Sequence, residues 1–281
     1  EQRDGGNEPR LFAVDRAIVL MFQLLPAIHA KVLLRDRSSI LPGGLGLILR
    51  IAPEKGKKPM SDPLSLIIYS DVICPWCYVG KRRLEAALDD PGVPQPASFA
   101  WRPFELNPDM PAEGVERHVY RASKFGAARS AELDHNMLET GREVGIAFAF
   151  DRMQRTPNTR LAHRLIWEAG RQGRQDPFVE RLFYGYFEEA LDIGEPEVLQ
   201  QLAAESGLDA DAVKAALTDT DSLDAVRGLE QEGYRLGIQG VPFFIVAQKY
   251  AVSGAQPPDF WRDALPRIAA EAVRPSPDAP A

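Results

Sequence analysis

Hydrophobic residues form one nearly continuous run in the first clear structural segment, residues 64–71 (LSLIIYSD). A run of this length, rich in β-branched and aromatic residues, is typical of a strand covered on both faces of a sheet. A helical pattern follows directly, because Pro75 suits the first position of a helix, Leu84 and Leu88 lie on one face, and DDPG ends it. Residues 97–104 (ASFAWRPF) alternate like a second strand, so the segment predicts a β-α-β unit.

The periodicity is helical from about residue 108 to residue 220, which predicts a module made of helices alone. Two of its helices begin near residues suited to an N-cap, Asn158 and Asp176. Strand signals return in residues 241–247 (VPFFIVA) and 249–254 (KYAVSG). The short link between these two strands predicts a hairpin.

The order of the elements is β-α-β, a long helical insertion, and then α-β-β-α, ending in a helix over residues 258–272. Without the insertion, this is the order of a thioredoxin fold. The sequence therefore predicts an α/β protein: a thioredoxin-like fold with an inserted all-α helical domain. The expected boundaries are an extension (1–59), the first half of the thioredoxin domain (60–107), the insertion (108–220), the second half (221–273) and a disordered tail (274–281).

The amino-terminal segment contains an apolar stretch, residues 17–30, of about the size of a signal-peptide core. Gln23 and Pro26 interrupt it, no clean small-residue cleavage pattern follows, and it is too short to span a bilayer. The residues after it are rich in Gly, Pro and Lys, as in a tail. We expect the folded protein to begin near Met60, with residues 1–59 disordered or foreign to the native protein.

The composition limits which partners and which cellular compartment we expect. Of the 281 residues, 45% are hydrophobic and 26% are charged, with a formal net charge of −7, so a full core is available without disulfides. The negative balance disfavours nucleic acid and anionic membranes as partners. Only two cysteines are present, which favours a reducing cytoplasm over a secreted disulfide scaffold. The oligomeric state stays open, and a homodimer is one option.

Both cysteines lie in one motif, CPWC, residues 74–77. A structural zinc site normally takes four Cys or His ligands, but the chain has no second cysteine pair and its four histidines are scattered, so we expect no metal. A bridge that closes so short a loop removes little chain entropy, which disfavours a structural staple. Reversible thiol chemistry remains.

The position of the motif predicts different roles for the two thiols. A spacing of three residues at the start of a helix places both sulfurs on one face, within reach of a disulfide. Cys74 faces the positive end of the helix dipole, which favours its thiolate and predicts that it is the nucleophile. Cys77 lies one turn further and is expected to resolve the mixed disulfide.

The residues between and after the cysteines bear on the redox potential of the pair and on the exposed face of the helix. Pro75 and Trp76 supply no cationic donor, so we expect a less oxidising pair than one that holds a protonated histidine there. Trp76 is also a candidate substrate-binding residue. Three basic side chains further along the helix are expected on a solvated face: Lys81, Arg82 and Arg83.

Five motifs occur in order: SDVICPWCYVGKRR, WRPFELNPDMP, RTPNTRLAHRL, GVPFFIV and YAVSGAQPP. With them the chain resembles the DsbA-like thioredoxin family, in its FrnE-type branch, over roughly residues 64–270. The resemblance implies a thiol–disulfide oxidoreductase or isomerase that acts on protein or small-molecule thiols without a bound cofactor, with glutathione as a candidate co-substrate. By position it maps the redox cysteines onto Cys74 and Cys77 and a cis-proline onto Pro242. Val241, before that proline, would offer backbone hydrogen bonds to an extended substrate.

The same resemblance points to residues with a weaker signal. Asn158, Thr159 and His163 resemble an element at the start of an inserted helix that can face the active cleft and bind substrate. Asn158 also suits a simple helix cap, and His163 suits a packed histidine that needs a partner before it can act in catalysis. Asp71 could relay protons to the buried cysteine, or it could only shape the turn before the helix.

Two other functions stay open. Kappa-class glutathione transferases and 2-hydroxychromene-2-carboxylate isomerases are similar in fold and insertion, so a glutathione-dependent isomerase or transferase is the first alternative. These relatives carry serine at the position of Cys74 and lack a partner at the position of Cys77, which favours redox chemistry here. The second alternative is a non-enzymatic client-binding module that uses the helical domain as an apolar clamp.

Overall fold

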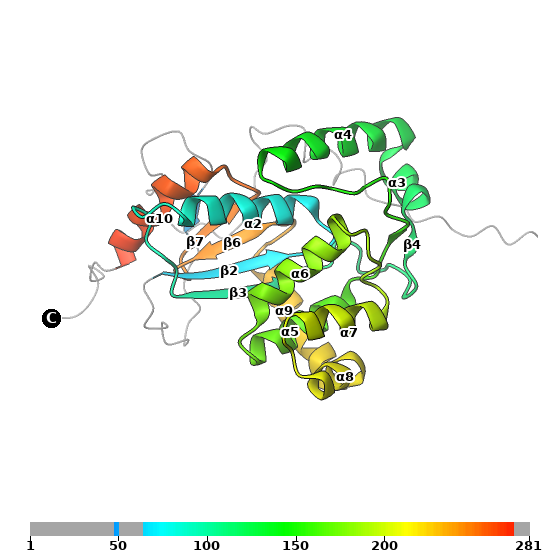
Figure 1. The fold of residues 1–281 in the computed structure, drawn as a ribbon. Coiled ribbons are helices and arrows are strands. Elements are labelled where there is room, and N and C mark those ends of the chain that lie inside the picture. The colour runs from blue at the N-terminus through cyan, green and yellow to red at the C-terminus, as the bar shows by residue number, and fades with distance from the viewer. Residues whose placement is uncertain (1–47, 51–63, 273–281) are drawn as a thin grey trace, which may run out of the picture.

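A five-stranded mixed sheet forms the centre of the protein in the computed structural model, which describes residues 48–50 and 64–272. Its strand order is β1-β7-β6-β2-β3, with β2 and β3 parallel and the other neighbours antiparallel (Figure 1). The strands are β1 (Ile48–Arg50), β2 (Ser65–Ser70), β3 (Ser98–Pro103), β6 (Phe243–Val246) and β7 (Tyr250–Ser253).

Strand β2 occupies the place in the sheet that its continuous hydrophobic run predicts. It is bonded on both sides, to β3 and to β6, and five of its six residues are buried. In the antiparallel register Tyr69 lies opposite Phe243. The residues that follow β2 therefore lie beside Val241 and Pro242, which precede β6. This register brings the CPWC loop and the predicted proline loop to the same edge of the sheet.

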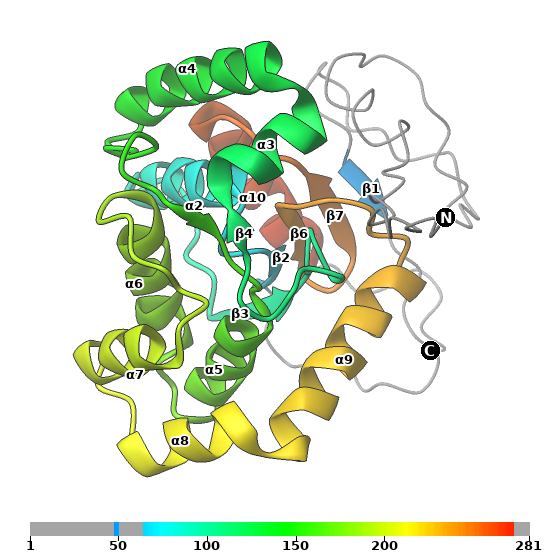
Figure 2. The same ribbon diagram turned by 90° about the vertical axis from the view of Figure 1, so that its right-hand side faces the viewer.

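Helices cover both faces of the sheet. Helices α2 (Pro75–Leu88) and α10 (Pro258–Ala272) contact each other on one face, and α9 (Thr220–Arg235) lies on the other (Figures 1 and 2). On the α9 face, Gly233 lies so close to the ring of Tyr69 that an added Cβ would come within 2.8 Å of it. The helix can approach the strand this closely only because that position is glycine.

The insertion between β3 and β6 is helical, as predicted, with one addition. A short antiparallel ladder of β4 (Val115–Glu116) and β5 (Arg155–Thr156) lies within it, so the insertion is not made of helices alone. Helices α5 and α6 contact β3 and cover that edge of the sheet. The inserted helices that precede α9 are α3 (Arg117–Phe125), α4 (Ala127–Glu143), α5 (Arg160–Arg171), α6 (Gln175–Phe187), α7 (Pro196–Glu205) and α8 (Ala210–Thr218).

One predicted helix start is wrong. Asp176 does not cap α6, because the helix begins at Gln175 and Asp176 lies in its first turn. The side chains of both residues bond Trp101 of β3 instead: the Trp101 amide donates to Gln175 Oε1, and the indole Nε1 donates to Asp176 Oδ1, each at 2.9 Å. These contacts between distant segments, which a local pattern cannot reveal, join the start of α6 to the sheet.

The amino-terminal prediction differs from the structure at three residues. Ile48–Arg50, inside the expected extension 1–59, pair with β7 as an antiparallel strand that runs from Ile48↔Val252 to Arg50↔Tyr250. This pairing satisfies backbone groups that β7 would otherwise leave open at the sheet edge. The rest of residues 1–59 and the expected tail 274–281 lie outside the described residues.

In the part of the chain that the structure describes, no helix combines the length and the hydropathy that crossing a bilayer requires.

Candidate active site

Cys74 is the residue that immediately precedes α2, in an extended conformation. Its amide donates to the Asp71 carbonyl at 3.0 Å, which closes a tight turn between β2 and α2. Its own carbonyl accepts the Cys77 amide at 3.0 Å in the first turn of the helix. Pro75, at the first helical position, lacks an amide that a helix start leaves unbonded in any case. The turn and the helix start together hold both thiols at the opening of α2.

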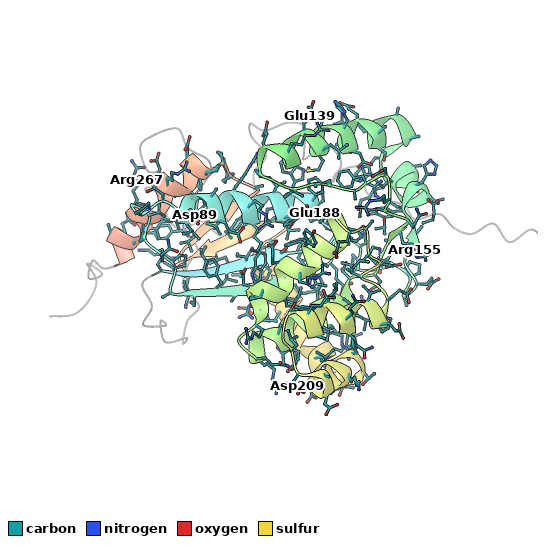
Figure 3. The ribbon with its side chains drawn as sticks, in the orientation of Figure 1. Asp89, Glu139, Arg155, Glu188, Asp209 and Arg267 are labelled. Atoms are coloured by element: carbon teal, nitrogen blue, oxygen red, sulfur yellow. The ribbon has the colours of Figure 1, made fainter. Side chains whose placement is uncertain are left out.

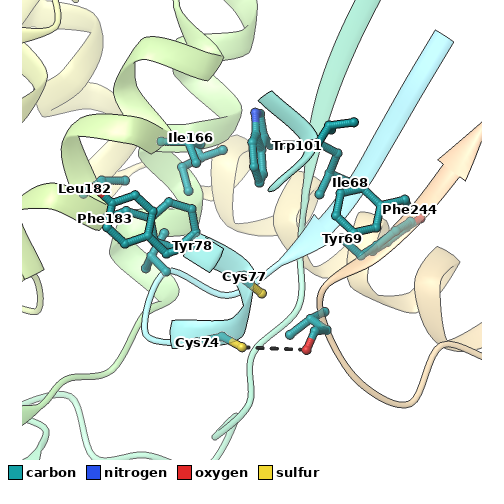
Figure 4. Close-up of a cluster of buried hydrophobic side chains, with 14 of the residues drawn as sticks. Ile68, Tyr69, Cys74, Cys77, Tyr78, Trp101, Ile166, Leu182, Phe183 and Phe244 are labelled. Carbon is teal, nitrogen blue, oxygen red and sulfur yellow. Dashed lines mark hydrogen bonds between the residues drawn. The ribbon is translucent and has the colours of Figure 1, made fainter. Parts of the chain in front are cut away.

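The predicted proline loop meets the outer thiol. Cys74 Sγ lies 3.7 Å from the carbonyl oxygen of Val241, 167 residues away in sequence (Figure 4). The peptide bond between Val241 and Pro242 is cis, which confirms the predicted isomer. Trp76, between the two cysteines, is half-buried and packs against the core.

Gly80, one turn beyond Cys77, makes room for the proline loop. A Cβ added there would lie 3.1 Å from Cγ of Pro242 and 3.4 Å from Cβ of Ala255. The Gly254 amide donates to the Pro242 carbonyl at 2.9 Å, so the segment after β7 supports the same loop. Helix α2 and the cis-proline loop can therefore lie in direct contact, with no side chain between them.

The two thiols are unbridged and differ in environment. Cys74 is 5% exposed and Cys77 is 1% exposed. Burial raises the pKa of the Cys77 thiol well above its usual value, and the neighbouring Cys74 sulfur raises it further. The Ser70 hydroxyl and the Asp71 backbone oppose this shift only in part. The site thus contains an outer thiol at the helix opening and an inner thiol that is protonated at neutral pH.

Asp71 and His163 form a buried pair behind the cysteine loop. Nε2 of His163 lies 3.5 Å from Oδ1 of Asp71, which makes this an ion pair without the geometry of a well-formed hydrogen bond. Burial lowers the pKa of His163, but the Asp71 carboxylate outweighs burial, with support from Glu105 and Glu230, so the pKa is raised. The other oxygen of Asp71 accepts the Leu106 amide at 2.7 Å. His163 therefore reaches the cysteine loop through Asp71.

Three further charged residues surround this pair and were missed by the sequence analysis. The buried Glu105 carboxylate accepts two hydrogen bonds from the Arg160 guanidinium, both at 3.0 Å. The Glu105 amide donates to Glu230 Oε1 at 3.0 Å. Burial raises the pKa of Glu230, and the charge of Glu105 raises it further. Glu105 and Arg160 each lie inside a quoted motif, WRPFELNPDMP and RTPNTRLAHRL, but nothing in the sequence indicates that the two side chains meet each other or Glu230 of α9.

Asn158 lies beside the start of α5, but the residue that precedes the helix is Thr159. The Asn158 side chain is buried; it accepts the Arg160 amide at 2.9 Å and donates to the Met110 carbonyl at 2.7 Å. Of the two expectations for Asn158, these contacts match a local turn and cap function, and they also join α5 to the loop after β3.

The expectation of a solvated basic face on α2 is wrong. Lys81 is buried, because α6 packs over it and brings Glu180 to 2.9 Å and Asp176 to 3.7 Å from its ammonium. Burial lowers the pKa of Lys81, but these carboxylates together with Glu85 outweigh burial and raise it. Two neighbouring side chains also bond other elements: Arg82 pairs with Glu180, and Arg83 donates to the Ala255 carbonyl at 2.7 Å.

Comparison with known proteins identifies the family. The model of the DSBA-like thioredoxin domain matches residues 65–266. The chain belongs to the DsbA-like thioredoxin family. A probable DsbA oxidoreductase from Streptomyces coelicolor has a similar crystal structure, with 32% identity and a TM-score of 0.69 over 76% of this chain and 93% of that one. The fold is therefore the predicted one, a thioredoxin-like α/β domain with an inserted helical domain.

Two further proteins are similar to this chain. YwbO of Bacillus subtilis (strain 168), described as uncharacterized, is 28% identical over 205 residues, which are 70% of this chain and 94% of that protein. The cytosolic disulfide reductase DsbM of Pseudomonas aeruginosa, solved with GSH, shares the fold with a TM-score of 0.51 and 23% identity, over 73% of this chain and 98% of that one.

The described residues were also considered as a possible metal site. Across residues 48–50 and 64–272, no group of three or more His, Cys, Asp or Glu side chains is arranged to hold a metal ion. The chemistry that the described site offers is that of two neighbouring thiols, a cis-proline loop and a buried set of charges behind them.

Proposed function

We propose that the protein is a thiol–disulfide oxidoreductase or isomerase of the FrnE type that works by dithiol–disulfide exchange through Cys74 and Cys77. The observation that carries the proposal is the outer thiol at the opening of α2, with its sulfur 3.7 Å from the Val241 carbonyl of the cis-proline loop. The inner thiol, one turn further and more buried, supports a division of labour between the two sulfurs.

The exchange proceeds in two balanced steps. The Cys74 thiolate attacks one sulfur of a substrate disulfide, forms a mixed disulfide, and releases the other substrate sulfur as a thiolate that takes up a proton. Cys77 then loses its proton and attacks Cys74 Sγ, which releases the second substrate thiol. The substrate gains two electrons and two protons, while the protein is left with a Cys74–Cys77 disulfide. The reverse sequence oxidises a dithiol.

Backbone and aromatic groups next to Cys74 hold the substrate in this proposal. The Val241 carbonyl and the Pro242 loop border the outer sulfur, and the half-buried Trp76 follows Cys74 by two residues. Asn158 and His163 contribute indirectly: Asn158 holds the start of α5, and His163 pairs with Asp71 behind the loop. Their contribution is to position the loop that presents Cys74.

We also propose a cytoplasmic location, with glutathione as the small thiol that recycles the pair. The two-cysteine composition supports a reducing compartment. DsbM, which shares the fold, is described as a cytosolic disulfide reductase and was solved with GSH. Thiol or disulfide substrates are the expected partners.

Reduction of insulin disulfides tests the function, with glutathione as the electron donor. Wild type should accelerate the precipitation of the insulin B chain, and Cys74→Ser should abolish the acceleration because the attacking sulfur is gone. Cys77→Ser is the matched control: the same substitution at the inner position should leave the first attack intact and trap a mixed disulfide that intact mass detects.

The other two functions predict different results from the same proteins. A Cys74→Ser variant that still conjugates or isomerises glutathione-dependent substrates would indicate a transferase or isomerase. If the wild type does not reduce insulin, and both it and Cys74→Ser bind unfolded proteins, the protein is a client-binding module. Either result would overturn the redox proposal.

A further inference from the structure

A cluster of hydrogen-bond donors lies on the inserted domain, on helix α3. Tyr120 OH donates to Asn107 Oδ1 at 2.6 Å, and Lys124 Nζ donates to the same oxygen at 2.9 Å. The Lys124 ammonium also donates to Tyr120 OH at 2.5 Å. Because an ammonium can only donate, the atom of Asn107 that accepts from it is the oxygen, which leaves the amide nitrogen free to donate to another group.

The cluster lies next to the cysteine loop. Asn107 follows Leu106, whose amide donates to the Asp71 carboxylate at 2.7 Å, and the Asp71 carbonyl in turn accepts the Cys74 amide at 3.0 Å. Consistent with this short path, the charge of Lys124 interacts with both the Asp71 carboxylate and the Cys74 sulfur. Helix α3 thus places a cation on the loop after β3, which is bonded to the cysteine loop through Asp71.

The donors in the cluster exceed the acceptors. Within residues 48–50 and 64–272, the half-buried Lys124 ammonium donates to the Asn107 oxygen and the Tyr120 hydroxyl and forms no ion pair with a carboxylate. Burial lowers the pKa of Lys124, the charge of Arg121 lowers it further, and Asp71 and Cys74 counteract these effects only in part. The Asn107 amide nitrogen is buried without a hydrogen-bond partner among the described residues. A buried donor without an acceptor costs free energy, so a group that brings acceptors and negative charge would stabilise the cluster.

We propose that Lys124 and Asn107 form a subsite for a carboxylate of the substrate, beside the disulfide that Cys74 attacks. A carboxylate brings two acceptor oxygens, which match one ammonium donor and one amide donor. The inference rests on the proposed thiol–disulfide exchange and adds a substrate preference to it: disulfides that have a carboxylate near the reacting sulfur. Glutathione disulfide and peptides with an acidic residue next to cysteine both have this chemistry.

Two chromogenic disulfides, one with carboxylates and one without charge, test the subsite in a single turnover. Reduced protein is mixed with 5,5′-dithiobis(2-nitrobenzoate), which has a carboxylate on each ring, or with neutral 4,4′-dithiodipyridine. Cys74 displaces one aryl thiolate from either reagent, and Cys77 then closes the protein disulfide and releases the product thiol. Lys124→Gln should slow the carboxylate reagent about tenfold and the neutral reagent less than about twofold, as expected when one charge-assisted hydrogen bond is lost.

The chain offers a matched control for this substitution. The Lys249 ammonium lies 5.4 Å from the centre of the Tyr250 ring, much as that of Lys124 lies 5.1 Å from the centre of the Tyr120 ring, but Lys249 belongs to the turn between β6 and β7. Lys249→Gln should change neither rate. Lys124→Arg keeps the charge and should recover most of the rate with the carboxylate reagent, while Lys124→Glu should slow that reagent further.

Three outcomes decide the proposal. Equal slowing with both reagents would overturn it, because Lys124 would then act on the reactivity of the Cys74 sulfur, and an unchanged rate with the carboxylate reagent would overturn it as well. Selective slowing supports it even if insulin is not a substrate, so the subsite and the proposed function can fail separately. The KM for glutathione disulfide, compared with that for peptide disulfides that have Glu or Gln next to cysteine, then tells which source of carboxylate the subsite prefers.

Discussion

Asp71 contacts several parts of the site, and besides the contacts that follow, its Oδ1 accepts the Ile73 amide at 3.4 Å. Its carbonyl holds the Cys74 amide, one carboxylate oxygen holds the Leu106 amide, and the other oxygen faces His163. The side chain is completely buried, so its charge depends on these neighbours and not on water. At the scale of single residues, the geometry of the cysteine loop therefore depends on a buried ion pair whose positive partner titrates.

This pair makes stability depend on pH above the ordinary pKa of histidine. Because the pKa of His163 is raised in the folded protein, the folded state holds more protons than the unfolded state above about pH 6.5. The stabilising contribution is then fully present below pH 6.5 and is lost as the pH rises through the raised value. Urea unfolding of wild type should give a free energy that declines over this range.

His163→Gln isolates the contribution of the histidine. The variant should lose most of the decline, because the facing groups Asp71, Glu105 and Glu230 are then left without a titrating partner at neutral pH. His135→Gln is the matched control: His135 lies on the surface of α4 and pairs with Glu139 at 3.5 Å, where solvent screens the interaction. A variant at His163 with the slope of wild type would contradict the assignment.

Single residues differed in how far the sequence could predict them. The cysteine pair was visible because both thiols belong to one short motif at a helix start, whereas the cis bond at Pro242 was expected from the family resemblance and not from its local sequence. Lys124 and Asn107 were not, because each is an ordinary polar residue until the fold brings α3 against the loop after β3. A cluster assembled from distant segments leaves no periodic signal in either one.

At the scale of elements, the approach of α2 to the cis-proline loop depends on Gly80. The contacts at 3.1 Å and 3.4 Å leave space for one methyl group only if Pro242 or Ala255 moves by a few tenths of an ångström. A branched side chain would force the helix and the loop apart.

Gly80→Val should therefore lower insulin reduction at least about tenfold, because a displacement of the Val241 carbonyl from Cys74 affects substrate alignment strongly. Gly228→Val is the matched control, since a Cβ at Gly228 of α9 meets no atom within 4 Å. Stopped-flow alkylation of Cys74 in the same variants reports whether the thiol itself stays reactive. Full insulin activity in Gly80→Val would show that the close contact has no part in the site.

The strands and the main helices were predictable because their patterns are strong and local. The continuous run in β2 and the proline that opens α2 are both visible without a structure. The buried face of Lys81 and the start of α6 were predicted wrongly, because both depend on how the inserted helices dock onto the sheet. Whether a helix face is buried is hard to predict where an inserted domain covers it, because charged side chains on that face can then be buried against charged partners.

At the scale of the whole molecule, aromatic and charged contacts hold the insertion to the thioredoxin domain at α2. The Tyr78 ring stacks on Phe183 with ring centres 5.1 Å apart (Figure 4), and its hydroxyl donates to Glu188 at 2.7 Å. Beside this stack, the Glu180 carboxylate pairs with the buried Lys81 and with Arg82. Both cations lower the pKa of Glu180 although burial opposes the shift.

Glu180→Gln should lower the free energy of unfolding by about 1–3 kcal/mol, because it leaves Lys81 with weaker compensation in a buried place. The difference from wild type should shrink as the pH falls below about 4.5, since protonation removes the same charge from the native side chain. Glu139→Gln, on the outer face of α4, should change stability little (Figure 3). If the two substitutions lowered the free energy of unfolding equally, the charge of Glu180 would not hold α6 to α2.

The separation of 167 residues between Cys74 and Val241 has a consequence during synthesis. The ribosome releases β2 and β3 early, but β6, which covers the other edge of β2, emerges only after all the inserted helices. Until then the nascent chain has an open strand edge and two thiols without the loop that later restricts access to them. Chains of this type therefore have a long interval in which premature oxidation or pairing with a neighbouring nascent chain competes with correct closure.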